Sequence, residues 1–215
     1  MILVNPAQEL QLDLVTHTYT RRGQVLPSTT EILANLGFIN KGSYECRRWP
    51  CSHPDHPNEA RNRGTRVHTW THYLDENDLD WASVDPAEEG YVWAWMQFKK
   101  DCGFKVQIIE VPWCNPDHGV AGCLDRAGIL VSGAVTGPAI VDIKTGGPQD
   151  WWALQLASYD WMVPEYALSQ PGPRHRLAVQ LNADGGYKVH PFNDPNDRGQ
   201  WLACVSNFNW KRNHA

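Results

Sequence analysis

A carboxylate and an ammonium stand two residues apart in the apolar run Ile-Val-Asp-Ile-Lys at 140–144. Side chains alternate between the two faces of a β-strand, so Asp142 and Lys144 share one face while Ile143 points into the core. A second acid, Asp125, stands near the start of another apolar run. Two aspartates that neighbouring strands bring together form an oxygen-rich site of the kind that Mg²⁺ prefers, with Mn²⁺ as a substitute. The backbone carbonyl of Ile143 is placed to complete the ligand set.

The chemistry that such a site indicates is hydrolysis of a phosphodiester. A divalent ion would polarise a phosphoryl oxygen and lower the pKa of a bound water, which together make the ester attackable at neutral pH. Lys144 could orient that water or neutralise the charge that builds on the phosphorus. The Asp-x-Lys spacing alone is more typical of a structural ion pair on a sheet, so the other residues of the pattern decide between the two interpretations.

Length and composition are those of a globular protein of one domain. The chain has 215 residues, 42% hydrophobic and 20% charged, and no apolar run approaches the ~20 residues of a membrane span. Its first residues do not resemble a signal peptide, so we expect a cytoplasmic protein with no membrane contact and with its six Cys reduced. The net charge of −5 is unusual for a nucleic-acid-binding protein, but acidic metal ligands account for part of it, and local basic patches still attract a polyanion.

Hydrophobic periodicity and turn residues predict three helices ahead of a sheet. A hairpin is expected over 10–26, and Ser28 and Glu31 have the spacing of a capping box before the first helix. Further helices are expected at 60–74, 85–103, 151–163 and 197–211, and strands at 104–113, 120–124, 129–131, 139–144, 175–181 and 187–192. The expected fold class is α/β, a central mixed β-sheet flanked by helices with a helical N-terminal region. The single domain 1–215 then comprises a hairpin and helices (1–103), a sheet with its motif helix (104–192) and a C-terminal helix (193–215).

Four short motifs occur in a fixed order around the two acids. They are His68 in Arg-Gly-Thr-Arg-Val-His, Gly122-x-x-Asp125, Asp142-x-Lys144, and Gln155-x-x-x-Tyr159, whose Gln and Tyr share one helix face. In this order and on these elements, the motifs resemble those of the PD-(D/E)XK nuclease superfamily, in particular its RecB-like branch, which includes phage-encoded exonucleases. The resemblance covers about residues 64–160, and the segment 17–33 is similar to the opening of phage-encoded members.

The resemblance implies the PD-(D/E)XK nuclease core and a set of metal ligands. Asp125, Asp142 and the Ile143 carbonyl would bind Mg²⁺, with His68 as a further ligand. Glu110 lies on the strand before Gly-x-x-Asp, where related nucleases often keep an acid. An acid between apolar neighbours on a strand is equally explained by exposure to solvent, so both readings of Glu110 stay open.

The same resemblance assigns the remaining motif residues. Lys144 would be the catalytic base or would position the water. Gln155 and Tyr159 would hold the motif helix and the substrate strand against the site, although on spacing alone Tyr159 is as well explained as a core residue. An iron–sulfur cluster is not expected, because only Cys204 follows residue 123 and the downstream cysteine cluster of some relatives is missing.

The function implied is that of an Mg²⁺-dependent DNA exonuclease in phage DNA recombination, repair or degradation, in the cytoplasm of a bacterial host. A single-strand annealing protein is a plausible partner of the resembled systems, and the oligomeric state is left open. One alternative is a structure-specific or restriction-like endonuclease. A second is a non-catalytic nucleic-acid-binding module with a zinc loop.

Three further groups of side chains have types that bind DNA or metal. Arginines that would contact phosphates, or else form a solvated helix face, are Arg61, Arg63 and Arg66. Among the eleven Trp, two that precede the Gln helix, Trp151 and Trp152, are candidates for stacking on unpaired bases. A zinc loop would use Cys46, Cys51, His53 and His56, but their spacing matches none of the familiar zinc patterns, so we expect no Zn²⁺.

Overall fold

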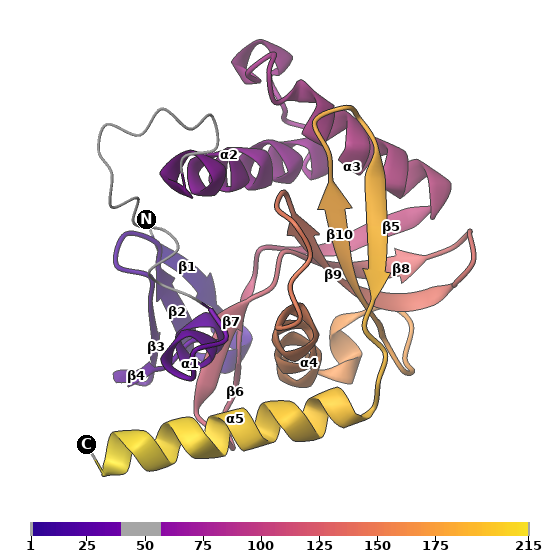
Figure 1. Ribbon diagram of the computed structural model, residues 1–215. Coiled ribbons are helices and arrows are strands. Elements are labelled where there is room, and N and C mark those ends of the chain that lie inside the picture. Colours follow the sequence, from indigo (N-terminus) through magenta and orange to yellow (C-terminus); the bar gives the residue numbers. More distant parts are fainter. Residues whose placement is uncertain (1, 40–56, 215) are drawn as a thin grey trace.

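The computed structural model describes residues 2–39 and 57–214 (Figure 1). The helices in these ranges are α1 (Thr29–Asn35), α2 (Pro57–Asp75), α3 (Glu89–Asp101), α4 (Trp152–Met162) and α5 (Asn196–Asn213). The strands are β1 (Ile2–Asn5), β2 (Leu10–Asp13), β3 (Thr18–Arg21), β4 (Gln24–Leu26), β5 (Phe104–Ile109), β6 (Pro112–Asn115), β7 (Val120–Cys123), β8 (Arg126–Leu130), β9 (Gly137–Lys144), β10 (His175–Leu181) and β11 (Tyr187–Pro191). No described helix is long and apolar enough to cross a membrane.

A five-stranded sheet of order β11-β10-β9-β8-β5 forms the centre of the molecule. β9 and β10 run parallel, connected by the crossover helix α4, whereas the other neighbouring pairs are antiparallel. α2 and α3 cover one face, and α4 covers the other with α5 packed against it (Figure 1). The prediction of an α/β protein with a mixed sheet flanked by helices is confirmed.

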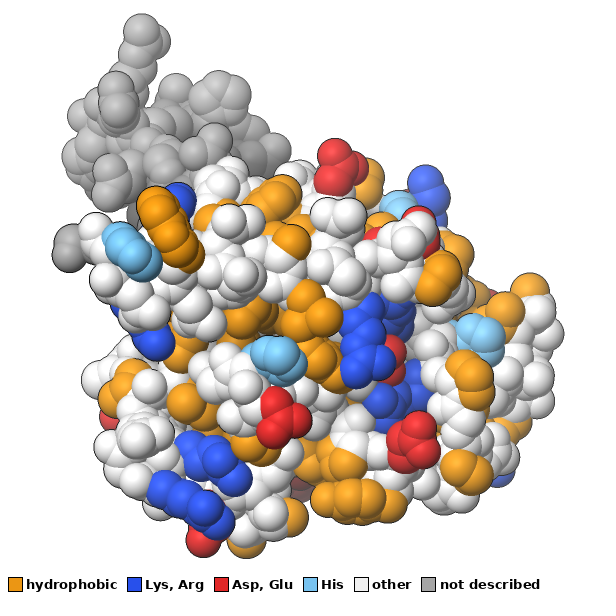
Figure 2. Space-filling model, turned by 90° about the horizontal axis from the view of Figure 1, so that it is seen from below, with side chains coloured by type: hydrophobic (Ala, Val, Ile, Leu, Met, Phe, Trp, Pro, Cys, Tyr) orange, Lys and Arg blue, Asp and Glu red, His pale blue; other side chains and the backbone are white. Residues whose placement is uncertain are grey.

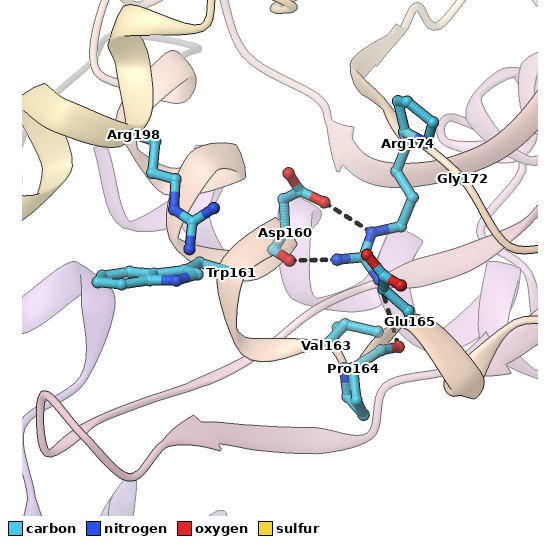
Figure 3. Close-up of a pocket in the computed structure, with 9 residues that line it drawn as sticks. Asp160, Trp161, Val163, Pro164, Glu165, Gly172, Arg174 and Arg198 are labelled. Carbon is cyan, nitrogen blue, oxygen red and sulfur yellow. Dashed lines mark hydrogen bonds and ion pairs between the residues drawn. The ribbon is translucent and has the colours of Figure 1, made fainter.

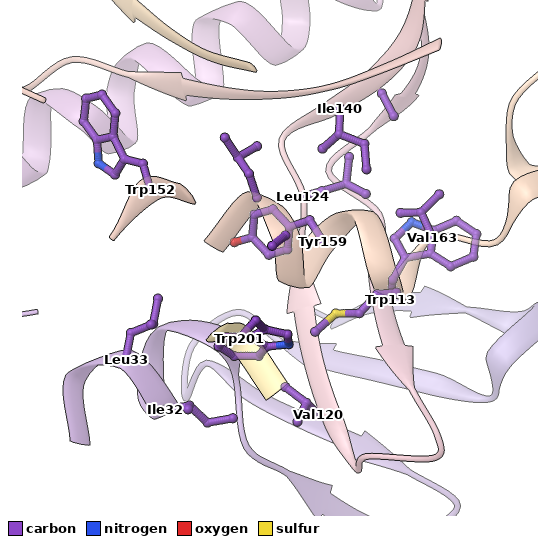
Figure 4. Close-up of a cluster of buried hydrophobic side chains, with 14 of the residues drawn as sticks. Ile32, Leu33, Trp113, Val120, Leu124, Ile140, Trp152, Tyr159, Val163 and Trp201 are labelled. Carbon is purple, nitrogen blue, oxygen red and sulfur yellow. The ribbon is translucent and has the colours of Figure 1, made fainter. Parts of the chain in front are cut away.

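Successive side chains of β9 point to opposite faces of the sheet and pack into two different hydrophobic cores. Ile140 faces α4 and belongs to a core with side chains from α1, α4 and α5, among them the fully buried Trp201 (Figure 4). Val141 and Ile143 point the opposite way and pack with the α2–α3 side, including Trp95. Burial of each such side chain contributes roughly 1.5–3 kcal/mol. The two cores hold β9 rigidly between helical layers, and its C-terminal end carries the candidate site.

The N-terminal region differs from the expected hairpin and helices. Residues 2–26 form a four-stranded antiparallel sheet of order β1-β2-β3-β4, in which the expected hairpin is extended by the pairing of β1 with β2. The capping box ahead of α1 is confirmed, since the Ser28 side chain accepts a hydrogen bond from the Glu31 N–H and the Glu31 side chain accepts one from the Ser28 N–H. The start of α3 was predicted too early, because Asp85 caps a turn by accepting a hydrogen bond from the Ala87 N–H.

The strand expected over 104–113 is two strands. β5 ends at Ile109, and Glu110 has a left-handed backbone with φ 47°, which an L-residue adopts only at a break in the strand. After this break β6 leaves the central sheet and pairs with β7 in a separate two-stranded sheet. The strand predicted at 129–131 begins earlier, at Arg126.

Candidate active site

At its C-terminal end β9 has no neighbouring strand on the β8 side, and the Asp125 side chain occupies that place. β8 pairs with β9 only from Arg126 opposite Val141, so the backbone of Ile143 has no β8 neighbour. The Ile143 N–H instead donates a 2.7 Å hydrogen bond to Asp125 Oδ2. The N–H and C=O of one residue in a strand point to the same side, so the Ile143 carbonyl also lies on the side of Asp125. Two of the predicted ligand groups, the Asp125 carboxylate and the Ile143 carbonyl, are therefore brought to one place because β8 begins only at Arg126.

Asp142 is a buried acid on β9, with 3% of its surface exposed. As the alternation predicts, it shares a face with Lys144, whose ammonium contacts Asp142 Oδ2 in an ion pair. That oxygen accepts no hydrogen bond of regular geometry from any described residue. Burial raises the pKa of Asp142 from 3.8 to about 6; the Lys144 charge opposes this rise, and the nearby Asp125 charge adds to it. Asp125 thus stands close enough to affect the ionisation of Asp142.

Lys144 is held from three sides. Its Nζ donates to Gln155 Oε1 at 2.9 Å and lies 5.2 and 5.5 Å from the ring centroids of Trp151 and Trp152. The Gln155 amide in turn donates a 3.0 Å hydrogen bond to the Tyr159 hydroxyl. Cation–π contacts and a hydrogen-bonded chain restrict the rotamers of a lysine far more than solvent does. The ammonium is accordingly fixed beside Asp142.

Tyr159 is a core residue, which is one of the two readings left open by its spacing. Its ring is buried in the core below the sheet, and burial raises the pKa of its hydroxyl well above 10, so the group stays protonated. A Cβ on Gly122 would lie 2.8 Å from Tyr159 Cε1, so the close packing of β7 on this ring requires glycine at that position. Gly122 therefore sets the position of the helix that supplies Gln155.

His68 and Glu110 approach the site from different directions. His68 projects from α2, with Nδ1 3.5 Å from Asp125 Oδ1. Glu110 lies beside the backbone of Asp125, but its carboxylate is engaged by His72 Nδ1 at 3.1 Å and by Arg126 at 3.3 Å. The Glu110 side chain is thus paired on both oxygens and remains 28% exposed.

The donor set at the site is of a kind that suits a hard divalent cation. Among the described residues no three His, Cys, Asp or Glu side chains stand together in the arrangement of a metal centre. Asp125 instead contacts His68 and the backbone of Ile143, while Asp142, with a buried oxygen that lacks a regular hydrogen bond, pairs with Lys144. Oxygen donors with one imidazole are compatible with Mg²⁺ or Mn²⁺.

Arg126 is a residue of the site that sequence reasoning missed. Its side chain is completely buried and donates hydrogen bonds to the Asp125 carbonyl at 2.7 Å and to Asp75 Oδ2 at 2.6 Å. Asp75, at the end of α2, also accepts a 3.0 Å hydrogen bond from the Trp95 indole and pairs with Lys99. The network ties the loop that carries Asp125 to α2. The available signal was the position of Arg126 directly after the acid.

A cavity of about 530 Å³ opens at the end of β9, and Lys144 and His68 line it. Its walls include Trp151 from the start of α4 and Phe38 after α1, which is 49% exposed and was not foreseen. Trp152 also lines the cavity, but it is 2% exposed and belongs to the core, which leaves little of its ring for the predicted contact with bases. Trp151 is the one of the two with a partly exposed ring.

The three arginines predicted to contact phosphates are in different environments. Arg66 forms ion pairs with Glu59 and Glu88, so its charge is already balanced. Arg63 places its guanidinium 5.7 Å from the centroid of the Tyr91 ring. Arg61 is the one of the three that is exposed. The predicted zinc-loop residues Cys46, Cys51, His53 and His56 lie outside the described residues.

A second cavity, of about 440 Å³, contains none of the predicted residues (Figure 3). Within it Arg174 donates hydrogen bonds to the side chain and carbonyl of Asp160, and Arg198 lies 4.8 Å from the centroid of the Trp161 ring. Its two arginines are matched by the two acids Asp160 and Glu165, so it has no net charge to attract a polyanion. On the face seen in Figure 2, basic side chains are likewise mixed with acidic and hydrophobic ones.

No protein-family model matches this chain, and no curated protein matches it. The functional interpretation therefore depends on the residues of the site and on their motif order. The arrangement places carboxylate oxygens next to a fixed ammonium, beside a cavity with aromatic walls.

Proposed function

We propose that the chain is a metal-dependent nuclease of the PD-(D/E)XK type, RecB-like branch, that hydrolyses DNA phosphodiester bonds from strand ends with an activated water. The observation that carries this proposal is the meeting of Asp125, Asp142 and Lys144 at the open end of β9. A structural ion pair would explain Asp142 and Lys144 alone. It would not explain why a second acid takes the place of the next strand, nor why Lys144 is held by Gln155 and two Trp rings.

Each side chain of the site has a role in this reaction. Asp125, Asp142, His68 and the Ile143 carbonyl would hold Mg²⁺ or Mn²⁺, which supplies Lewis-acid polarisation of the phosphoryl oxygen. Lys144 donates hydrogen bonds into the cavity, where it orients the attacking water and neutralises the charge that develops on the phosphate. Gln155 keeps the ammonium directed at the cavity, and Tyr159 keeps Gln155 in place.

The biological setting follows the same proposal. A nuclease of this type acts on phage DNA in recombination, repair or degradation, in the cytoplasm of the bacterial host, with a single-strand annealing protein as a partner. Arg61 on α2 is exposed and Trp151 lines the cavity, so both would meet the substrate strand. No covalent intermediate is needed, since water is the nucleophile.

The test is digestion of end-labelled single- and double-stranded DNA with Mg²⁺ or Mn²⁺. We expect Asp142→Asn and Lys144→Ala to lower the rate by about 10²–10³, whereas Asp117→Asn, an exposed acid in the β6–β7 turn, keeps the wild-type rate. A covalently closed circular substrate should resist an exonuclease and be cut by an endonuclease. Cleavage by both site variants at the wild-type rate would contradict the proposal.

A further inference from the structure

A row of polar side chains runs from Lys144 to the edge of the central sheet. In the register of the strands, Lys144 stands beside Gln180 on β10, and Gln180 stands beside Lys188 on β11. Residues paired in this way project from the same face of a sheet. The three side chains therefore lie on the face that carries Asp142, and β11 is the edge strand.

The two outer members of the row have free donors. Gln180 Oε1 lies 3.0 Å from His190 Nε2, which leaves its amide NH₂ without a hydrogen bond among the described residues. Burial, with a smaller contribution from Lys188, lowers the pKa of His190, so the imidazole is neutral and donates its one N–H to Gln180. Lys188 is exposed and forms no ion pair within the described ranges. By contrast Arg66, on the α2 side, has its charge balanced by two glutamates.

We propose that Gln180 and Lys188 bind the phosphodiester backbone of the substrate strand on one side of the scissile phosphate. This inference rests on the proposed function. Amide and ammonium donors are the groups that bind phosphate oxygens without reading sequence. Neighbouring strands lie ~4.8 Å apart, so the backbone at Lys188 is ~10 Å from that at Lys144. A nucleic-acid strand covers this distance in about three nucleotides at ~3.4 Å each.

An edge-strand lysine has a second possible role, because its charge keeps two sheets from pairing edge to edge. The two roles differ in what they affect. Phosphate binding changes the affinity for DNA and its dependence on salt. Protection of the edge changes self-association and leaves DNA binding as it was.

The experiment measures cleavage of a long end-labelled oligonucleotide by the full chain over a series of salt concentrations. Lys188→Ala and Gln180→Ala should raise KM about five-fold with kcat unchanged, and Lys188→Ala should lower the slope of log KM against log salt by about 1. The matched control is Lys105→Ala, which removes an exposed lysine from β5, the opposite edge of the same sheet, and should behave as wild type.

The outcomes separate this inference from the proposed function. If the wild type cuts DNA but Lys188→Ala has the KM and salt slope of Lys105→Ala, the phosphate contact is wrong and the proposed function stands. Self-association of Lys188→Ala with unchanged KM would assign the residue to edge protection only. If the wild type neither cuts DNA nor binds it, both proposals fall.

Discussion

Replacement of Asp142 by Asn distinguishes the effect of this side chain on the stability of the fold from its effect on DNA cleavage. Asp142 is 3% exposed, and burial raises its pKa from 3.8 to about 6. The folded protein therefore binds this proton more tightly than the unfolded chain does. The resulting stabilisation is fully present below about pH 4 and is lost as the pH rises through about 6. The difference between the two pKa values corresponds to roughly 3 kcal/mol.

Asp142→Asn keeps the shape of the side chain and cannot ionise. At about pH 8 we expect the free energy of unfolding of the variant to exceed that of wild type by up to roughly 3 kcal/mol, and at about pH 4 to be nearly equal. Lys144 retains the Gln155 oxygen and both Trp rings, and its attraction to the ionised Asp142 already opposes the rise of that pKa, so the expected gain in stability includes the loss of this partner. The same variant should lose cleavage activity, since a carboxylate ligand is gone.

The assay is urea unfolding followed by Trp fluorescence at several pH values between about 4 and 8, first with a chelator and then with Mg²⁺. Wild type should gain about 2.7 kcal/mol when Mg²⁺ reaches a hundred times its Kd, and the variant much less at the same concentration. Asp117→Asn serves as the control for the loss of one negative charge. A variant that is less stable than wild type at about pH 8, or a difference independent of pH, would refute the reasoning.

Four further substitutions test how the site is supported. Arg126→Met leaves Asp75 buried without its main partner and should lower the free energy of unfolding by about 3–5 kcal/mol in urea titrations; a change below 1 kcal/mol would show that the network is not structural. Gly122→Ala brings a methyl within 2.8 Å of Tyr159 and should cost about 1–3 kcal/mol while lowering kcat, and unchanged kcat would contradict the link from Gly122 to Gln155. Trp151→Ala should raise KM with little loss of stability, whereas Trp152→Ala should destabilise the fold by about 3–5 kcal/mol; the reverse pattern would assign base contact to the buried ring.

Sequence periodicity predicted the elements that are regular and failed where the backbone is not. β9, α4, α5 and the capping box of α1 follow from apolar spacing and cap residues, which are local signals. The break at Glu110 depends on a left-handed backbone that an apolar pattern does not reveal. β1 is too short to show a period, and its pairing with β2 is determined by the tertiary fold.

In the site, too, some features follow from local sequence signals and others depend on the tertiary fold. That Asp142 and Lys144 share a face follows from strand alternation, and the ion pair between them agrees with it. Asp125 reaches the backbone of Ile143 because the pairing of β8 with β9 begins only at Arg126. A single sequence does not show where that pairing begins. Trp151 and Trp152 look equivalent in sequence and differ only once α4 is packed. Arg66 appears free until the fold brings Glu88 to it.

The claim beneath the proposed function is that two aspartates hold one hard cation, and a Mn²⁺ titration followed by electron paramagnetic resonance tests it most directly. Wild type and Asp117→Asn should bind Mn²⁺ with equal affinity, and Mg²⁺ should compete for the ion. Asp125→Asn and Asp142→Asn should each weaken binding at least about ten-fold. Equal affinity in all four proteins, or no binding by wild type, would contradict the assignment of this site.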